Sequence, residues 1–383
     1  MPPTVLMVSK PIAPPWNDSG KNLVRDLARH GSRYGYRLLT TRAYAEEKRR
    51  APPNGASHLT WEPLYPTRGS FTPALGQNLR VLARLLARDD ADIRHFFFAP
   101  NPRTVAAARV VQRLRRTRTV QTVMSAPREG LALAKLLFAD RIVALSAWSR
   151  SRLIDAGIDA ERIALIPPGI ALPPRSAAIP RRDAASRARH GLGAEPVVLF
   201  AGDYEFSHAA RTLADAIPLV LARARATFLF ACRLKTPAAR TAEARVRERV
   251  RANGSAARVV FRNDVDDMPS LAGACDLCVM PAESLYAKMD LPLVLLEAMA
   301  RGTPVVVAGA GPLGEVVAGG GGVAVPPRDP AALARALGDL LLDGDARARM
   351  GEEARRVAEA RFDAREAARL HEALYDEMME IRQ

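Results

Sequence analysis

The chain has 383 residues, of which 48% are hydrophobic and 5% aromatic, and it carries a formal net charge of +15. This length favours about two domains, and the apolar fraction is sufficient for two hydrophobic cores. No apolar run reaches the roughly 18 residues that a membrane span requires, and Met1 to Lys10 lacks the layout of a signal peptide. We therefore expect a cytoplasmic protein.

The predicted elements alternate between short β-rich runs and helical patterns along almost the entire chain. The predicted strands are 4–8, 36–40, 92–98, 119–124, 141–145, 162–166, 197–201, 226–231, 258–261, 276–280, 304–308 and 322–325. The predicted helices include 20–32, 73–89, 102–115, 131–138, 147–156, 208–223, 237–253, 268–274, 292–301, 313–318, 329–342, 345–359 and 363–381. Such alternation with near-continuous apolar strands indicates α/β domains with parallel sheets that helices cover on both faces.

The domain organisation follows from a proline-rich stretch without a strand pattern, residues 171–195, which predicts a linker. It separates two doubly wound, Rossmann-like domains, residues 1–170 and 196–360. The final helix, in residues 361–383, has no specified packing site, and a return to the N-terminal domain is one option. Ligands of such sheets bind outside the carboxyl ends of the strands, so we expect an interdomain cleft. The composition of residues 45–72 predicts a loop. This loop either shapes a pocket or is a mobile part of the surface.

The first predicted strand leads into a loop and then a helix. Asp18 or Ser19 can cap this helix, and Gly20 allows a ligand to approach the backbone. The arrangement suits a phosphate or sugar site, and an ordinary capped loop is the alternative. His95 lies within a strand of the same domain. We assign Ser19, Gly20 and His95 to the acceptor or sugar side, with a core histidine as the alternative for His95.

Two strands of the second domain end in polar loops. Gly202 begins the loop after the strand 197–201, and Arg233 and Lys235 follow the strand 226–231. In an extended segment Arg233 and Lys235 point in the same direction, and two cations suit a diphosphate. A basic loop in an arginine-rich chain is the alternative.

Residues 288–307 predict a loop, a helix, a tight turn and a buried strand. Pro292 is expected at the first helical position, where its missing N–H costs nothing. The helix N-terminus beside Lys288 is a candidate anion site. Glu297 falls on or beside the buried face, where a carboxylate requires a partner. These features suit a nucleotide, with its diphosphate at the helix start and its ribose at Glu297.

The remaining charges and the cysteines are less specific. The 56 basic residues are scattered, which indicates either solvated helix faces or a basic face for an acidic partner such as anionic lipid. No aromatic-interleaved basic stripe supports a nucleic-acid partner. Cys275 and Cys278 lie in an apolar run that predicts a buried strand, and no second Cys/His pair supports a metal site. The absence of G-x-S-x-G, H-E-x-x-H and Walker patterns argues against hydrolases and ATPases.

In its ordered set of motifs the chain resembles the retaining glycosyltransferases of family 4, which have the GT-B fold. The matching segments are residues 139–146, 166–170, 276–281, 295–306 and 311–317, so the resemblance covers nearly the whole chain. It implies a metal-independent transferase without a cofactor. The enzyme would move a sugar from a nucleotide diphosphate sugar to an acceptor and retain the anomeric configuration.

The resemblance also implies roles for residues. The second glutamate of the family's E-x7-E motif matches Glu297, which would hold the ribose, whereas the first falls on Met289, with Asp290 or Glu283 as substitutes. We assign Lys288, Asp290 and Arg233 as catalytic. The donor-binding set is Gly202, Arg233, Lys235, Lys288, Asp290, Leu293, Val294 and Glu297.

The expected partners are a nucleotide sugar and an unidentified acceptor, which is a glycan, a lipid or a small molecule. Peripheral contact with anionic lipid at the inner membrane face is a further expectation, and nucleic acid is not expected. Two alternatives stay open: a sugar-nucleotide epimerase of similar two-domain fold, and a non-catalytic basic protein that binds nucleic acid or membranes.

Overall fold

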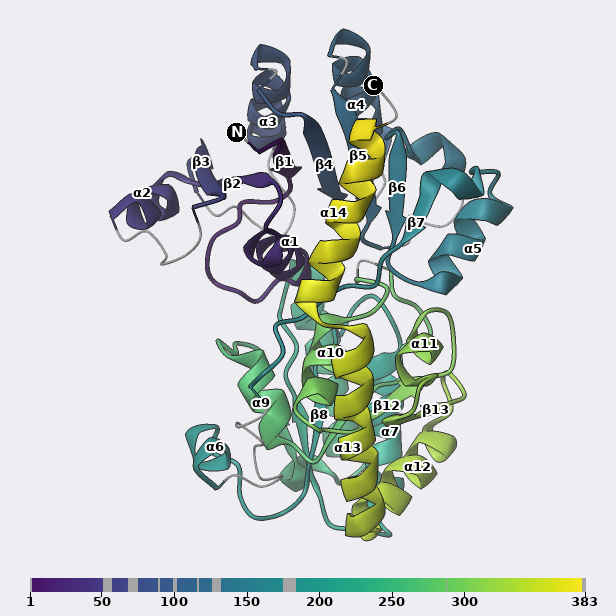
Figure 1. Cartoon of the computed structure of the whole chain (residues 1–383). Helices are drawn as coiled ribbons and strands as arrows, with labels where there is room; N and C mark the ends of the chain where they lie inside the picture. Colours follow the sequence, from purple (N-terminus) through teal and green to yellow (C-terminus); the bar gives the residue numbers. More distant parts are fainter. Residues whose placement is uncertain are drawn as a thin grey trace. The chain divides into compact units, whose positions relative to one another are not determined.

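The computed structural model describes residues 2–50, 57–67, 75–88, 90–98, 102–115, 117–125, 132–174, 184–286 and 288–380. The chain divides into two compact units. Unit 1 comprises Met1–Ala171, Ala287–Asp290 and Asp363–Gln383, and unit 2 comprises Leu172–Tyr286 and Leu291–Phe362. Each unit contains a parallel sheet flanked by helices (Figure 1).

Within its described residues, unit 1 has a seven-stranded parallel sheet with the order β3-β2-β1-β4-β5-β6-β7. Its strands are β1 (Thr4–Val8), β2 (Gly35–Thr41), β3 (Leu59–Tyr65), β4 (Ile93–Phe98), β5 (Arg118–Val123), β6 (Arg141–Ala144) and β7 (Ile163–Leu165). Its helices are α1 (Ser19–His30), α2 (Arg42–Arg50), α3 (Leu75–Ala87), α4 (Pro102–Leu114), η1 (Leu133–Leu136), α5 (Ala147–Asp155), η2 (Ala160–Arg162) and α14 (Ala364–Glu380). The order reverses between β1 and β4, which is where doubly wound sheets bind ligands.

Unit 2 has a six-stranded parallel sheet, counted over the residues that the structure describes, with the order β10-β9-β8-β11-β12-β13. Its strands are β8 (Val197–Phe200), β9 (Thr227–Phe230), β10 (Val259–Phe261), β11 (Leu277–Met280), β12 (Val305–Ala308) and β13 (Gly322–Val325). Its helices are α6 (Ala184–Arg189), α7 (Ala209–Leu221), α8 (Pro237–Ala252), η4 (Ala256–Arg258), α9 (Met268–Ala274), α10 (Leu293–Ala300), α11 (Leu313–Val317), α12 (Pro330–Leu342) and α13 (Gly344–Arg361). Every residue of β8, β11 and β12 is buried, as expected when helices cover both faces.

The predicted strands are all present, and their observed ends lie within one residue of the predicted ends. The prediction of a loop over 45–72 is wrong in part, because α2 and β3 lie there. β3 pairs only with β2 at the sheet edge, where a strand tolerates Glu62 and Pro63 without an apolar pattern. The predicted helix 131–138 contains only η1. Residues 51–56 and 68–72 of the predicted loop, 175–183 of the predicted linker, residue 131 and residues 381–383 lie outside the described residues.

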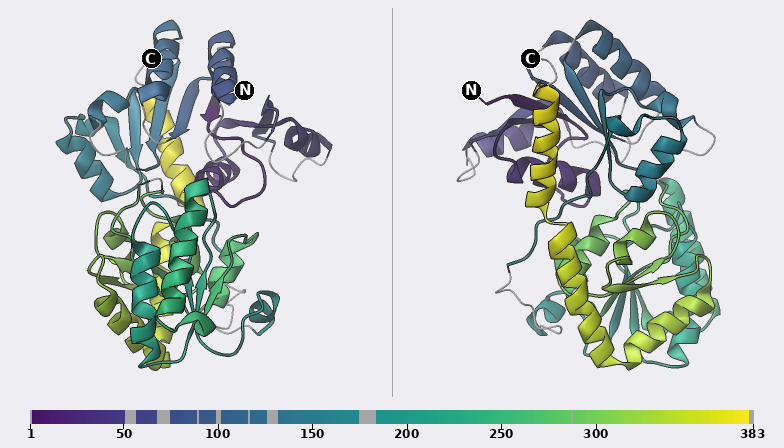
Figure 2. Two further views of the ribbon diagram at one scale, coloured as in Figure 1. Left: turned by 180° about the vertical axis from the view of Figure 1, so that it is seen from behind. Right: turned by 45° about the vertical axis from the view of Figure 1, so that its right-hand side comes forward.

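Helices cover both faces of the unit 1 sheet (Figure 2). Successive side chains of β4 point to opposite faces of the sheet. Phe96 packs into an apolar core with α3 and α4 residues, such as Leu85 and Val105. His95 contacts Tyr375 of α14 instead. Helices α1 and α14 therefore lie on one face, and α3 and α4 on the other.

Helix α14 belongs to unit 1 and is attached there by a buried carboxylate. Glu372 accepts hydrogen bonds from the backbone N–H groups of Ser32 (2.7 Å) and Arg33 (2.9 Å) and from the Tyr36 hydroxyl (2.9 Å). The final segment of the chain thus packs with residues 32–36. The sequence pattern left the packing site of this helix unspecified.

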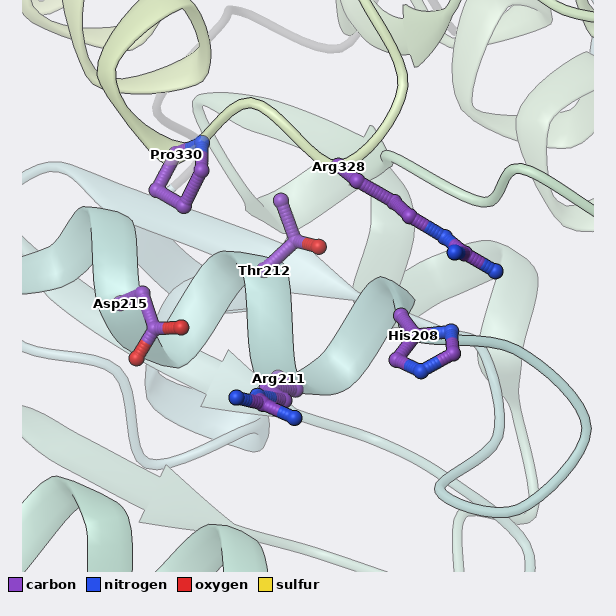
Figure 3. Close-up of a pocket in the computed structure, with 6 residues that line it drawn as sticks. All are labelled: His208, Arg211, Thr212, Asp215, Arg328 and Pro330. Atoms are coloured by element: carbon purple, nitrogen blue, oxygen red, sulfur yellow. The ribbon is translucent and has the colours of Figure 1, made fainter.

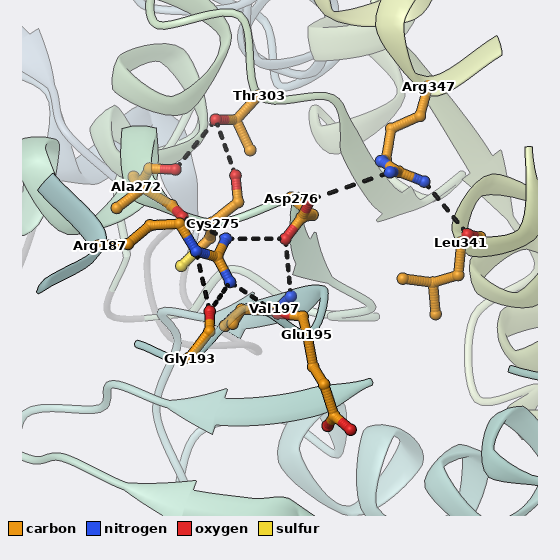
Figure 4. A network of polar contacts seen from close by, with 11 residues as sticks. Arg187, Gly193, Glu195, Val197, Ala272, Cys275, Asp276, Thr303, Leu341 and Arg347 are labelled. Atoms are coloured by element: carbon orange, nitrogen blue, oxygen red, sulfur yellow. Dashed lines mark hydrogen bonds and ion pairs between the residues drawn. The ribbon is translucent and has the colours of Figure 1, made fainter. Parts of the chain in front are cut away.

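Helix α6 lies inside the predicted linker, and a buried arginine attaches it to unit 2 (Figure 4). Arg187 donates to Asp276 (3.1 Å) and to the carbonyls of Gly193 and Glu195 (2.6 Å each). Asp276 also accepts from the backbone N–H of Val197, at the start of β8 (2.8 Å). A buried pair with this many hydrogen bonds is costly to break, so α6 is a structural part of unit 2.

Cys275 and Cys278 are buried free cysteines, of which Cys275 is the C-cap of α9 and Cys278 lies in β11. The prediction of a buried strand is confirmed there. Burial, with smaller contributions from neighbouring groups, raises the pKa of both thiols. Over the described residues, no cluster of His, Cys, Asp and Glu side chains suits a metal ion. None of the helices described is both long and apolar enough to cross a membrane.

Candidate active site

Three polar loops meet at the carboxyl edge of the unit 2 sheet. They follow the neighbouring strands β9, β8 and β11. The hydroxyl of Thr236, after β9, donates to the carboxylate of Glu205, after β8. His208, also after β8, is hydrogen-bonded to Glu283, after β11 (2.6 Å). Within unit 2 the structure thus brings together the loops that contain Gly202, Arg233 with Lys235, and Glu283.

The loop after β8 is closely packed at its start and hydrogen-bonded to a buried carboxylate. A Cβ added to Gly202 would lie 2.3 Å from Cζ of Phe200, so only glycine fits. Asp203 is buried and accepts from the N–H groups of Glu205 (2.9 Å) and Phe206 (2.6 Å). The acidic residue that follows Gly202 therefore shapes the turn.

Arg233 and Lys235 lie in the short connection between β9 and α8, and both are half-buried. Thr236 ends this connection as the N-cap of α8 and accepts from the N–H of Ala239 (3.1 Å). The cap fixes where the helix starts, and it therefore limits the connection to a few residues at the carboxyl end of β9.

Helix α10 begins at Leu293, and Pro292 is its N-cap, with φ −62° and ψ 122°. The prediction that Pro292 is the first helical residue is therefore wrong by one position, since its ψ is extended. Proline has no side-chain acceptor, and Pro292 makes no side-chain cap. Helix starts of this kind favour an anion. Leu293 is buried and Val294 half-buried in this first turn.

Glu297 is half-buried on α10, which agrees with its expected position beside the buried face. Its charge acts on buried Cys278 and half-buried Arg301. Burial and the Glu297 carboxylate together raise the pKa of the Cys278 thiol to about 12. Burial lowers the pKa of Arg301, and Glu297 opposes that shift.

Glu283 forms a charged cluster that the sequence did not reveal. Its carboxylate accepts from the His208 N–H (3.0 Å) and from Arg328 (3.1 Å). Burial alone would raise the pKa of Glu283, but these hydrogen bonds hold it below its usual value. The sequence offered Glu283 as a substitute for the missing first glutamate. Arg328 lies in the connection between β13 and α12, and no sequence motif marks it.

A pocket of about 310 Å³ lies beside this cluster (Figure 3). Its walls come from the first turns of α7 and from the connection between β13 and α12. The lining residues are His208, Arg211, Thr212, Asp215, Arg328 and Pro330. The pocket therefore belongs to the same edge of the sheet as the loops described above.

In unit 1 the loop after β1 ends in a capped helix. Asp18 accepts from the N–H groups of Gly20 (3.0 Å) and Lys21 (3.3 Å) and is the N-cap of α1. The structure thereby selects Asp18 over Ser19 as the cap. Ser19 and Gly20 are half-buried residues of the first helical turn.

His95 lies inside the unit 1 core and is fully buried. One ring nitrogen is hydrogen-bonded to the Tyr375 hydroxyl and the other to the Thr122 hydroxyl, each at 2.7 Å. Burial, with the nearby His371, holds the pKa of His95 well below its usual value. The geometry favours the alternative interpretation, a core histidine with both nitrogens satisfied, over the assigned acceptor or sugar side.

Asp290 is also buried, and it belongs to unit 1 together with Lys288. Its carboxylate accepts hydrogen bonds from the hydroxyls of Ser146 (3.0 Å) and Ser149. Ser146 is the N-cap of α5 and accepts from the N–H of Ser149 (3.0 Å). The carboxylate thus fastens residues 288–290 to the start of α5. Met289 is buried beside it, so its thioether does not replace a glutamate.

The comparisons with known proteins agree with this architecture. Residues 21–172 match the model of Glycosyltransferase Family 4, and residues 195–343 match Glycosyl transferases group 1. A D-inositol 3-phosphate glycosyltransferase of Xylanimonas cellulosilytica is 33% identical over 219 residues, which are 55% of this chain and 50% of that protein. The chain thus spans about half the length of the curated relatives it matches.

Two solved structures share the fold at low identity. Sucrose-phosphate synthase from Thermosynechococcus elongatus has a TM-score of 0.76 at 20% identity and covers 99% of this chain and 100% of its own. Anabaena HepE in complex with UDP has a TM-score of 0.73 at 20% identity and covers 98% of this chain and 100% of its own. The two family matches cover most of both units, and the chain therefore belongs to glycosyltransferase family 4 and has the GT-B fold.

Proposed function

We propose that the protein transfers a sugar from a nucleotide diphosphate sugar to an acceptor and retains the anomeric configuration. The observation that carries this proposal is the family match over both units. The carboxyl edge of the unit 2 sheet supports it, because two cations follow β9 and an α10 start without a side-chain cap follows β11. That edge is where doubly wound sheets bind nucleotides.

The donor is held mainly by charge. Arg233, Lys235 and Lys288 bind the diphosphate, and the first N–H groups of α10, at Leu293 and Val294, face the same anion. Gly202 allows the backbone after β8 to approach the ligand. Glu297 accepts hydrogen bonds from the ribose hydroxyls.

The reaction is catalysed by stabilising the leaving group. The bond between the anomeric carbon and the diphosphate oxygen breaks while the acceptor oxygen forms a bond on the same face of the sugar. The acceptor proton moves to the departing oxygen, so no protein nucleophile, metal or cofactor takes part. Lys288 and Arg233 stabilise the charge that develops on the diphosphate, which is electrostatic catalysis.

The roles of Asp290, Ser19 and Gly20 follow from where these residues lie in unit 1. Asp290 contributes by fastening residues 288–290 through Ser146 and Ser149, which positions Lys288. Ser19 and Gly20 begin α1, after the loop that follows β1, and form the acceptor or sugar side.

The acceptor is a glycan, a lipid or a small molecule. Inositol 3-phosphate belongs in an acceptor panel because a relative is named for it. We also propose peripheral contact with anionic membranes.

The test is a transfer assay in EDTA with uridine, guanosine and thymidine diphosphate sugars and the acceptor panel. The anomeric configuration of the product is read by NMR. We expect a retained linkage, and about tenfold or greater loss of activity in Glu297→Gln, since a charged hydrogen-bond partner contributes about 1.5–3 kcal/mol. Glu248→Gln, at an exposed position of α8, is the matched control. An inverted product, a requirement for metal, or isomerised donor without acceptor would contradict the proposal.

A further inference from the structure

Exposed apolar side chains gather on two neighbouring helices of unit 1. Helices α3 and α4 pack against the same sheet face and share a core. Their outer surfaces carry Leu75 (75% exposed), Leu79 (54%), Val110 (48%) and Leu114 (66%). Each pair is spaced four residues apart, so each helix presents one apolar stripe. These four are close to half of the exposed large hydrophobic side chains of the described chain.

The same surfaces contain positive charge and no acidic side chain. Residues 75–88 and 102–115 include no Asp or Glu, although the chain has 41 acidic residues. Arg80, Arg88, Arg109 and Arg113 are exposed there. Arg84 differs, because it is buried and paired with Glu62. The outer surfaces of both helices therefore combine exposed apolar side chains with arginines, and neither helix contains an acidic residue.

We propose that this α3–α4 face (Leu75, Leu79, Arg80, Val110, Arg113 and Leu114) docks on an anionic lipid bilayer. Surface-lying amphipathic helices insert apolar side chains at the headgroup boundary and place cations against lipid phosphates. The flexible arginine stems extend the apolar contact while their guanidinium groups stay in the polar layer. The inference names the surface for the membrane contact that belongs to the proposed function, and it does not depend on the transferase activity.

Charge and composition favour lipid over the other occupants. A partner of uniformly negative charge suits a face without acids. Nucleic acid also has that charge, but phosphates offer exposed leucines no apolar surface to pack against. Neither helix carries an aromatic side chain on which bases could stack. A bilayer satisfies both the leucines and the arginines.

The test is co-sedimentation of the full chain with vesicles of phosphatidylcholine alone or with about one third phosphatidylglycerol, which supplies a surface charge of the kind that attracts basic segments. We expect binding to the anionic vesicles that weakens as salt increases. Arg80→Gln and Arg113→Gln should each lower the binding constant about fivefold, since one basic residue near an anionic surface contributes on that order. Leu79→Ser with Leu114→Ser should lower it further at constant charge.

Matched controls use the same side chains elsewhere. Leu342→Ser on α12 and Arg245→Gln on α8 replace exposed residues of unit 2 and should bind like the wild type. Melting temperatures of all variants verify folding. The proposal is wrong if the wild type ignores anionic vesicles, if the α3–α4 variants bind as the controls do, or if Leu79→Ser with Leu114→Ser instead dissolves a dimer without changing vesicle binding.

Discussion

Replacement of Asp290 tests whether its carboxylate anchors residues 288–290 or contacts the sugar. In the structure this carboxylate is 1% exposed and accepts two hydroxyl hydrogen bonds, from Ser146 and Ser149. Each hydrogen bond to a charged group contributes about 1.5–3 kcal/mol, so Asp290→Ala should lower the free energy of unfolding by about 3 kcal/mol or more. Asp290→Asn keeps an acceptor oxygen and should lower it by about 1–2 kcal/mol.

The assay combines urea unfolding with steady-state kinetics. Unit 1 and unit 2 can unfold separately, so two spectroscopic probes are followed. Ser149→Ala and Asp290→Ala, singly and together, should show a coupling of about 1.5–3 kcal/mol. In kinetics, Asp290→Asn and Ser149→Ala should have similar, moderate effects. The reasoning is refuted if Asp290→Asn abolishes turnover while Ser149→Ala changes neither turnover nor stability, because the carboxylate would then touch the sugar.

Three further predictions concern stability. Burial holds the pKa of His371 at about 4 in the folded state, below its ordinary 6.5, so the unfolded chain binds the proton more tightly. Stability from this group should therefore fall by about 3 kcal/mol as pH drops from 6.5 to 4, and the difference between wild type and His371→Leu in urea unfolding measures it. A Cβ at Gly169 would lie 2.5 Å from Cα of Ala364, so Gly169→Ala should expose α14 to hydrogen exchange, whereas Gly314→Ala, with nothing within 4 Å, should not. Arg187→Met should cost about 3–5 kcal/mol because it removes the closer of two arginines paired with buried Asp276, at 3.1 Å, and leaves Arg347 at 3.9 Å. Equal stability of Arg187→Met and of Arg189→Met, at an exposed position, would disprove this.

The fold was largely predictable because the central strands are buried on both faces. Such strands are short apolar runs, and β8, β11 and β12 match their predicted ranges. β3 was missed for the opposite reason. It is an edge strand with polar residues and Pro63, and only its pairing with β2 makes it a strand. Helix α6 was missed because Arg187 stabilises it through Asp276, which is 89 positions away in the sequence and lies just before β11.

The site was predictable only where its residues are close in sequence. The approach to α10, with Lys288, Pro292 and Glu297, is a single segment whose helix start and acid can be read from spacing. The bonds of Asp290 to Ser146 and Ser149 span 144 and 141 positions, and no local pattern predicts them. His208 and Glu283 are 75 positions apart and meet because β8 and β11 are neighbours in the sheet.

The central claim, that a nucleotide diphosphate sugar binds at the carboxyl edge of the unit 2 sheet, is tested most directly by a thermal-shift screen. Uridine, guanosine and thymidine diphosphate sugars are added in EDTA to three proteins: the wild type, the double variant Arg233→Gln with Lys235→Gln, and a control. The control carries Arg240→Gln and Arg245→Gln, at exposed positions of α8. Ligand binding to the folded state raises the melting temperature. We predict that at least one nucleotide sugar stabilises the wild type and the control but not the Arg233/Lys235 variant. Stabilisation of all three proteins alike, or of none, would contradict the claim.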